Sequence, residues 1–199
     1  DGAQSTPHSK IDVQKIGADF FAFSVHKMAG PTGMGVLYGK EEELRKLKTF
    51  LVGGDTVSDT FYNNACSWNE PPYKFEAGLQ NYAGQIGAGA AAEYLMAIGM
   101  EEISLHEKEL NEHITKALLE AYPEIIQIIG PRDAGLRSGI FSFRLLKRGE
   151  VIEKTKGKPI ERDLISPDEI GQILDGKLNI MIRAGSHCVH SWFNDKGIG

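Results

Sequence analysis

The sequence predicts an α/β domain followed by a smaller α+β domain, and three observations lead to this prediction. A nearly continuous apolar strand segment precedes glycine-rich turns in the first half of the chain. Two helical segments then follow each other directly near residue 100. The second half, rich in Glu, Lys and Ile, combines short apolar segments with one well-marked helix start. We therefore expect one domain over residues 1–100 and another over residues 101–199.

The first half contains two expected strands and one short helix. Residues 19–24 form a nearly continuous apolar run, which is typical of a strand buried on both faces. After a Gly-Pro-Thr-Gly turn at 30–33, residues 34–38 form a second strand. A short polar helix is expected over residues 41–48, and residues 52–72 carry only loop signals.

Two helices are expected to lead into the second domain. Residues 83–98 form a helix with one face of small residues, which permits the close approach of another backbone. Gly99 ends this helix. The next helix has apolar residues at spacings of three, four and seven from Ile103 to Ala121, and Pro123 ends it.

The second domain is expected to contain three strands and a helix. Residues 125–129 are apolar, and residues 140–145 alternate with period two. Residues 166–169 read Ser-Pro-Asp-Glu, which is a strong start for a helix to about residue 174. Residues 179–183 form a final strand that leads into a glycine-containing loop.

Composition and charge exclude several classes of protein. Of the 199 residues, 41% are hydrophobic and 25% charged, so the chain is not mainly disordered, collagenous or coiled coil. Its 22 basic and 27 acidic residues give a net charge of −5, so we expect neither nucleic acid nor a membrane as a partner. The two cysteines indicate a reducing compartment, and we expect a cytoplasmic protein.

A lysine and two candidate phosphate ligands follow the first expected strand. Ser24 and His26 stand where α/β folds present ligands, and both side chains can donate hydrogen bonds to a phosphate. Lys27 can form an imine with an aldehyde. The alternative for Lys27 is an ordinary solvated side chain. His8 lies in a polar context, and we expect it to be solvated.

The first four residues change the interpretation of Lys27. Asp1 is the carboxylate that a pyridinium nitrogen requires, because its charge keeps this nitrogen protonated and the ring an electron sink. Gln4 can donate to a phenolic oxygen beside the imine. The chain between Asp1 and Lys27 is long enough for a crossover helix and a strand, so one site can contain both. The alternatives are a turn or helix-capping aspartate and a surface amide.

Cys188 is a candidate sulfur nucleophile. It follows the last expected strand on a loop with Gly185, beside Arg183 and His187, and a nearby cation favours the thiolate over the thiol. The alternative is a buried cysteine that packs as a small hydrophobic residue. His187, Cys188 and His190 form a short cluster, but the sequence has no second pair of ligands such as Cys-x-x-Cys. We therefore expect no zinc or other metal site.

Together the motifs resemble those of SUF-type cysteine desulfurases, which are class V aminotransferase-like enzymes of fold type I that use pyridoxal 5'-phosphate. The resemblance covers essentially all of the chain and rests on four segments: Asp1-Gly2-Ala3-Gln4, Ser24-x-His26-Lys27-x-x-Gly30-Pro31-Thr32-Gly33-x-Gly35, Phe75-Glu76-Ala77-Gly78 and Arg183-x-Gly185-x-His187-Cys188. It implies the later half of a large cofactor domain, with a mostly parallel sheet and helices, plus an incomplete small C-terminal domain. The sequence does not begin with Met, and we expect it to be a fragment of a longer chain.

The resemblance also implies a role for each cofactor-binding residue. Lys27 would hold pyridoxal 5'-phosphate as an imine and move protons during the reaction. Asp1 would pair with the pyridine nitrogen and Gln4 with the phenolic oxygen. Ser24 and His26 would bind the phosphate.

By the same resemblance, L-cysteine is the substrate and L-alanine the product. Cys188 would receive the sulfur as a persulfide, with Arg183 and His187 as candidate substrate-site residues. The family's members are homodimers that pass sulfur to an acceptor or scaffold protein of iron–sulfur cluster assembly. The alternatives are a selenocysteine lyase, another class V enzyme such as an epimerase or aminotransferase, or a non-catalytic homologue.

Three positions depart from the family pattern. Val25 stands where the family usually has Gly, and it would add a β-branched side chain beside the phosphate. Leu79 replaces a Thr that reaches the phosphate of the other subunit in the family. Ser186 stands where many relatives have His. We therefore expect a weaker phosphate contact between subunits.

Overall fold

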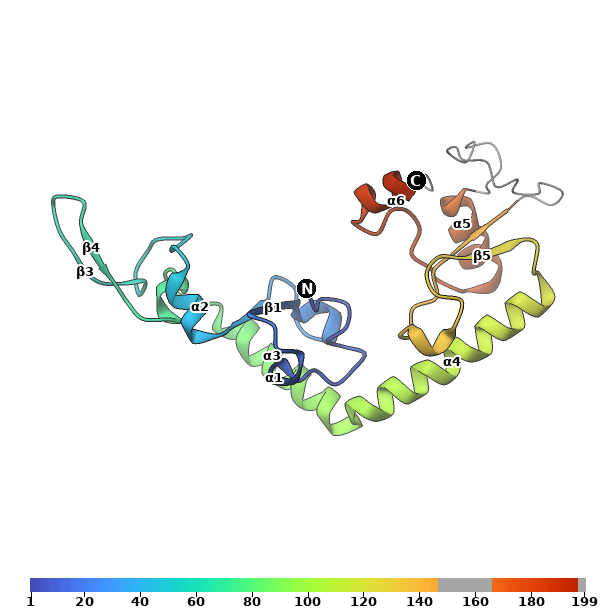
Figure 1. Ribbon diagram of the computed structural model, residues 1–199, viewed down its shortest axis with the longest axis horizontal. Helices are drawn as coiled ribbons and strands as arrows, with labels where there is room; N and C mark the ends of the chain where they lie inside the picture. Colours follow the sequence, from blue (N-terminus) through green and yellow to red (C-terminus); the bar gives the residue numbers. More distant parts are fainter. Residues whose placement is uncertain (147–165, 197–199) are drawn as a thin grey trace. The chain divides into compact units, whose positions relative to one another are not determined.

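The computed structural model describes residues 1–146 and 166–196, and its chain divides into two compact units, Asp1–Glu107 and Lys108–Gly199 (Figure 1). The described strands form three two-stranded antiparallel sheets. The mostly parallel sheet expected from the resemblance is thus not found within these ranges, although the α/β class is confirmed. None of the helices in these ranges is long and apolar enough to cross a membrane. The domains predicted over residues 1–100 and 101–199 stay a prediction, because compactness does not test independent folding.

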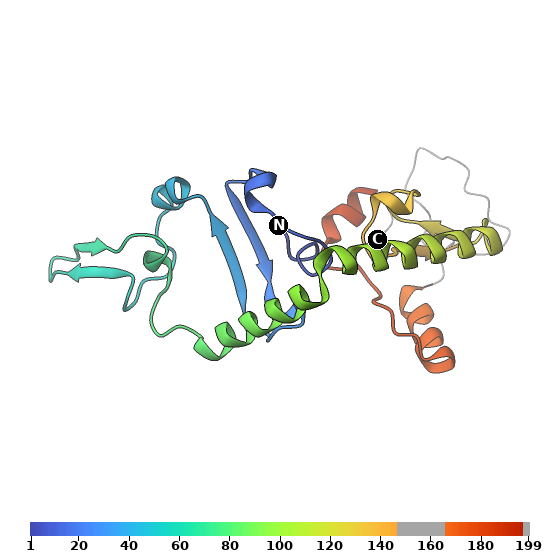
Figure 2. The same cartoon turned by 90° about the horizontal axis from the view of Figure 1, so that it is seen from below.

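The first unit is built around the hairpin of β1 (Phe20–Ser24) and β2 (Gly35–Gly39), whose arrows run side by side in Figure 2. Both strands were predicted. Phe21 is buried, but Ala22 is exposed, so the prediction of a strand buried on both faces is wrong within the described residues. Apolar runs also occur in hairpin strands, and the sequence pattern cannot tell these from buried parallel strands.

A helical segment with a small-residue face covers part of this hairpin's connecting turn. Helix α3 (Tyr82–Ile98) begins at Asn81, whose side chain accepts a hydrogen bond from the Gly84 backbone at 3.0 Å. A Cβ atom on Gly87 would lie only 2.9 Å from the Pro31 ring. The turn between β1 and β2 therefore approaches this face closely, through the ring of Pro31, whereas the sequence predicted the approach of a backbone.

The first unit also holds further short elements, of which the sequence predicted only one. Helix α1 (Val13–Ile16) is a single turn, and α2 (Glu41–Lys46) agrees with the predicted polar helix. The hairpin of β3 (Val57–Thr60) and β4 (Cys66–Trp68) lies in the segment expected to be only loop. Turn-forming residues such as Gly53, Gly54, Asn63 and Asn64 flank these short strands and conceal them in the sequence.

Helix α4 (Met100–Ala121) follows α3 directly, with Gly99 between them at φ +100°. Both helices and the glycine between them agree with the prediction. The backbone at Gly99 has a conformation that side chains rarely adopt, so glycine permits the abrupt change of helix here. The helix ends two residues before Pro123, as predicted.

The second unit contains one strand pair and two further helices. Strands β5 (Ile126–Ile128) and β6 (Phe143–Leu145) are antiparallel and shorter than predicted. Helix α5 (Pro167–Leu178) begins at the predicted proline. Helix α6 (His190–Lys196) was not predicted.

The strand predicted over residues 179–183 is wrong, because these residues form no strand in the structure. Asn179 ends α5 in the left-handed conformation, and the Ile180 backbone N–H still donates to Leu174 at 3.1 Å. The apolar side chains that suggested a strand include Met181, which is 87% exposed. An apolar segment becomes a strand only when another strand pairs with it, and none of the described strands does so here.

Candidate active site

Backbone contacts fasten the first residues of the chain beside β1. The Gly2 backbone N–H donates to the Ala22 carbonyl at 2.7 Å. A Cβ atom on Gly2 would collide with Cζ of the Phe21 ring, so any larger residue would force the ring or this segment to move. The Thr6 hydroxyl in turn donates to the Gly2 carbonyl at 2.8 Å. These contacts hold Gln4 near the end of β1.

The Lys27 amine meets the Gln4 amide at this end of the strand. Lys27 Nζ donates to Gln4 Oε1 at 3.2 Å. Both side chains are exposed, so a ligand can reach the amine. The structure therefore brings together two of the residues that the sequence assigned to one site, although they are 23 positions apart.

Lys27 stands on a tight 3₁₀ turn over Val25–Met28, which follows β1 directly. The Val25 backbone N–H donates to the Met34 carbonyl at 3.0 Å, and this bond fixes the start of the turn. Val25 and Met28 point inward and are buried, while His26 and Lys27 are exposed. The Val25 side chain is 1% exposed, so it fills the interior and does not cover the exposed side chains of the turn.

The remaining predicted cofactor ligands lie on the same two segments. Asp1 is exposed, and its Oδ1 accepts a hydrogen bond from the Ala3 backbone at 2.8 Å, as in an aspartate-stabilised turn. Ser24 is half-buried at the end of β1, and His26 is exposed beside it. Among the described residues, no hydrogen bond or ion pair joins Asp1, Ser24 or His26 to Lys27.

A histidine that the sequence did not suggest belongs to this site. Gln4 Nε2 lies 3.4 Å from His8 Nε2, and His8 Nδ1 lies 2.6 Å from Glu107 Oε1. The prediction that His8 is simply solvated is therefore wrong, because it bridges Gln4 and a carboxylate. Glu107 is 99 positions from His8 along the chain, so no local sequence signal could have indicated this pair.

The candidate sulfur nucleophile lies on an exposed turn. His187 and Cys188 are both left-handed, with φ of 49° and 66°, and the Val189 backbone N–H donates to the Ser186 carbonyl at 2.9 Å. Cys188 is exposed, so the alternative of a buried packing cysteine is wrong. Arg183 and His187 are exposed on the same segment. Lys27 and Cys188 belong to different compact units.

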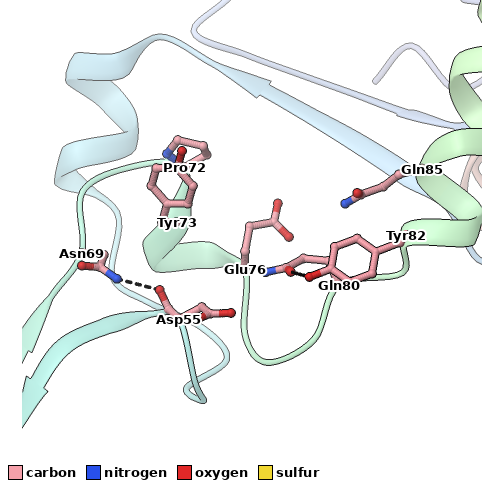
Figure 3. A pocket seen from close by; sticks show the side chains of 8 residues that line it. All are labelled: Asp55, Asn69, Pro72, Tyr73, Glu76, Gln80, Tyr82 and Gln85. Atoms are coloured by element: carbon pink, nitrogen blue, oxygen red, sulfur yellow. Dashed lines mark hydrogen bonds between the residues drawn. The ribbon is translucent and has the colours of Figure 1, made fainter.

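A hollow of about 510 Å³ opens beside the Phe75–Gly78 motif (Figure 3). Its walls carry carboxylates, carboxamides and phenol rings and contain none of the predicted site residues; the lining residues are Asp55, Asn69, Pro72, Tyr73, Glu76, Gln80, Tyr82 and Gln85. The Tyr82 hydroxyl donates to Gln80 Oε1 at 3.0 Å, and Asn69 Nδ2 donates to the Asp55 carbonyl at 2.8 Å. Leu79, where the family has Thr, is 84% exposed next to this hollow's lining residues.

The donor set at the end of β1 fits a phosphorylated pyridine aldehyde. The Lys27 amine is accessible for an aldehyde, and the Gln4 amide beside it provides a hydrogen-bond donor. Asp1 offers a carboxylate on the segment fastened to β1. Ser24 and His26 offer a hydroxyl and an imidazole at the strand end, which suit a phosphate.

The chain belongs to the Aminotransferase class-V family, which it matches over residues 1–198. Among its relatives, a probable cysteine desulfurase from Halalkalibacterium halodurans is 41% identical over 188 residues, which are 94% of this chain and 40% of the relative. A probable cysteine desulfurase from Aeropyrum pernix is also 41% identical, over 194 residues, with 96% of this chain and 43% of the relative covered.

Solved structures of cysteine desulfurases share the fold. The apo cysteine desulfurase from Thermococcus onnurineus NA1 matches 99% of this chain with a TM-score of 0.79 and 32% identity, over 44% of its own length. A cysteine desulfurase from Escherichia coli, in its S-sulfonic acid form, matches 99% of this chain with a TM-score of 0.76 and 28% identity, over 43% of its length.

The chain thus spans about two fifths of the length of the curated relatives that it matches. These shares do not support the expected placement of the chain in the later half of such an enzyme, with its C-terminal domain. That placement stays a prediction.

Proposed function

We propose that the protein containing this chain is a pyridoxal 5'-phosphate-dependent cysteine desulfurase. It converts L-cysteine to L-alanine and transfers the sulfur to Cys188. The observation that carries this proposal is the accessible Lys27 amine, which is held against Gln4 at the end of β1. The similarity to cysteine desulfurases over nearly the whole chain supports it.

Each cofactor-binding residue has a task that its chemistry suits. When bound, pyridoxal 5'-phosphate supplies an electron sink for the reaction. Lys27 binds the aldehyde and moves a proton, and Asp1 holds a positive charge on the pyridine nitrogen. Gln4 donates a hydrogen bond to the phenolic oxygen. Ser24 and His26 donate to the phosphate.

The thiol of Cys188 is the acceptor of sulfur. In the net change, the Cβ–Sγ bond of cysteine breaks, an S–S bond to Cys188 Sγ forms, and the proton of the Cys188 thiol ends on alanine. The products are L-alanine and a persulfide, so no external oxidant is needed. The exposed turn around Cys188 supports this role, because both the donor and a later acceptor must reach the sulfur. Arg183 and His187 are exposed on the same segment and offer positive charge or hydrogen bonds to the substrate.

The full-length protein loaded with cofactor tests the role of Lys27. We expect Lys27→Ala to abolish the visible absorbance band of the bound cofactor and the release of alanine from cysteine. Lys15→Ala removes another exposed lysine of the same unit and should change neither. A Lys27→Ala protein with an unchanged band and unchanged alanine release would disprove the assignment.

A pair of cysteine variants tests the sulfur transfer. Cys188→Ser should retain the visible band but lose persulfide formation, which mass spectrometry detects as an addition of one sulfur atom. Cys66→Ser is the matched control, because Cys66 is the other free cysteine and is half-buried in β4. Normal sulfur transfer by Cys188→Ser contradicts the proposal. Turnover of amino acids without sulfur or selenium would instead indicate another class V enzyme.

We also propose the cellular setting implied by the resemblance. The enzyme is a cytoplasmic homodimer that passes sulfur to an acceptor or scaffold protein of iron–sulfur cluster assembly. Two free cysteines support a reducing compartment, and the exposed thiol supports transfer to a partner. Persulfide loss from the enzyme upon addition of a purified scaffold protein would support the last step.

Finally, we propose that residues 1–100 belong to the later half of the large domain and residues 101–199 to the small domain. The order of the motifs supports this, because by resemblance the lysine turn precedes the cysteine loop of the small domain. Limited proteolysis of the full-length protein, followed by mass spectrometry, checks the boundary. Stable fragments that cut through either range would contradict it.

A further inference from the structure

A continuous chain of hydrogen bonds connects Glu107 on α4 to the Lys27 amine. Glu107 Oε1 lies 2.6 Å from His8 Nδ1, and His8 Nε2 lies 3.4 Å from Gln4 Nε2. Gln4 Oε1 then accepts from Lys27 Nζ at 3.2 Å. All four residues belong to the first unit, Asp1–Glu107.

The chemistry of these groups fixes the direction of each hydrogen bond. A lysine ammonium only donates, so the Gln4 amide must turn its oxygen to Lys27 and its nitrogen to His8. The amide nitrogen also only donates, so His8 Nε2 must be the accepting nitrogen of a neutral imidazole. The proton of the ring is then on Nδ1, where it is donated to Glu107.

Burial distinguishes the His8–Glu107 pair from a second contact between the N-terminal segment and α4. The side chains of His8 and Glu107 are 25% and 22% exposed. Those of Lys10 and Glu101, which also join the N-terminal segment to α4, are 68% and 72% exposed. A half-buried hydrogen bond is less open to competition from water, so it can hold a defined geometry.

We propose that His8 and Glu107 are positioning residues that orient the Gln4 amide at Lys27. Glu107 selects the His8 tautomer, and in that tautomer His8 accepts from the Gln4 amide nitrogen and holds the amide in the orientation that Lys27 requires. The Gln4 amide nitrogen carries two hydrogens, and one of them forms the hydrogen bond to His8. The second amide hydrogen stays available for an acceptor beside Lys27. We take that acceptor to be the phenolic oxygen of the cofactor, and in this respect the inference rests on the proposed function.

Loss of the carboxylate has a specific consequence in this arrangement. Without Glu107, the His8 proton can move to Nε2, which then faces the Gln4 nitrogen as donor against donor. The Lys27 ammonium still requires the amide oxygen, so the amide keeps its orientation and loses the acceptor that held its nitrogen. The His8 tautomer would change and the Gln4 amide beside Lys27 would be held less firmly, whereas a merely structural pair would affect stability alone.

Nitrogen NMR on the cofactor-free full-length protein tests the tautomer directly. We expect a neutral His8 with its proton on Nδ1, retained in Glu107→Gln because the amide oxygen still accepts. Glu107→Ala should shift the proton toward Nε2. Glu101→Ala is the matched control on the same helix and should leave His8 unchanged. A wild-type His8 with its proton on Nε2, or no change in Glu107→Ala, would overturn the proposal.

Titration of the same proteins with pyridoxal 5'-phosphate tests the consequence at Lys27. We expect Glu107→Ala to bind the cofactor about 10-fold more weakly, as is common for residues that orient a ligand group, and Glu107→Gln to recover most of that affinity. Equal affinity in all variants would overturn the proposal. If Glu107→Ala does not fold, His8→Phe keeps a ring of similar shape without its hydrogen bonds and should show the same loss.

The two measurements separate this inference from the proposed function. A wild-type protein that does not bind pyridoxal 5'-phosphate contradicts the proposed function, and the NMR result still decides the positioning. A wild-type protein that binds the cofactor while His8 has the other tautomer contradicts only the positioning.

Discussion

At Gly2 the absence of a side chain allows the first residues to lie against β1. A Gly2→Ala variant would place its Cβ atom in the Phe21 ring, and the ring or the segment must move. We expect a loss of about 1–3 kcal/mol in the free energy of unfolding and weaker cofactor binding, because Gln4 moves with this segment. Thermal unfolding and cofactor titration measure the two effects.

Gly54→Ala serves as the control for this prediction, since a Cβ atom there meets no other atom within 4 Å. It should change stability little. A Gly2→Ala protein as stable as Gly54→Ala, with the same affinity for the cofactor, would contradict the packing argument.

Single residues also show how far the sequence could predict the site. The resemblance assigned Gln4 and Lys27 to one site, and their side chains lie 3.2 Å apart, while their roles toward a cofactor stay predictions. It did not indicate His8, whose partner Glu107 is remote in the chain. Such partners become visible only when the fold brings two segments together.

Among the elements, the ends of β1 and β2 are joined by an ion pair with a predictable pH dependence. Lys40 Nζ donates to Asp19 Oδ1 at 2.7 Å, and this hydrogen bond and the lysine charge hold the pKa of Asp19 below its ordinary value. The carboxylate form is therefore favoured by folding. Its stabilising effect is present above the unfolded pKa of about 3.9 and is lost as pH falls through the lower folded pKa.

An Asp19→Asn variant tests this linkage. The wild-type protein should have a slightly higher Tm than the variant near neutral pH, and the difference should disappear as the pH falls below about 4. The effect is small because the pair is exposed. Asp59→Asn, on exposed β3, is the control. A Tm difference that grows on acidification would refute the assignment.

Two glycines of α3 separate helix propensity from packing. A Cβ atom on Gly89 meets nothing within 4 Å, so Gly89→Ala should raise the free energy of unfolding by about 0.5–1 kcal/mol. Gly87→Ala has the same gain in propensity, but its Cβ would lie 2.9 Å from the Pro31 ring. We expect this variant to be less stable than Gly89→Ala in chemical unfolding. Equal stabilisation by the two variants would show that the turn around Pro31 can move without a cost in free energy.

The elements that were predicted correctly share a local signal. Helices α3, α4 and α5 have periodic apolar residues or marked ends within their own sequence. The failures involve pairing between segments, which no local pattern contains. Residues 179–183 are apolar without a partner strand, whereas β3 and β4 pair despite a loop-like composition.

For the whole molecule, the exposed apolar side chains of helix α3 are the feature that bears on assembly. Its apolar side chains form an exposed stripe that winds around the helix: Tyr82, Ile86, Tyr94 and Ile98 are 53%, 75%, 61% and 47% exposed. A continuous apolar stripe of this kind usually becomes covered by another surface. The proposed homodimer provides such a surface.

An Ile86→Glu variant of the full-length protein tests this assignment. A charge in the centre of a subunit contact should dissociate the dimer, because its desolvation is not compensated. Sedimentation should then show a folded monomer, with an unchanged circular dichroism spectrum. Ser104→Glu, an exposed position on α4, should remain dimeric. If Ile86→Glu stays dimeric, the stripe is not the contact between subunits. If it unfolds, the stripe is instead covered by the protein's own chain.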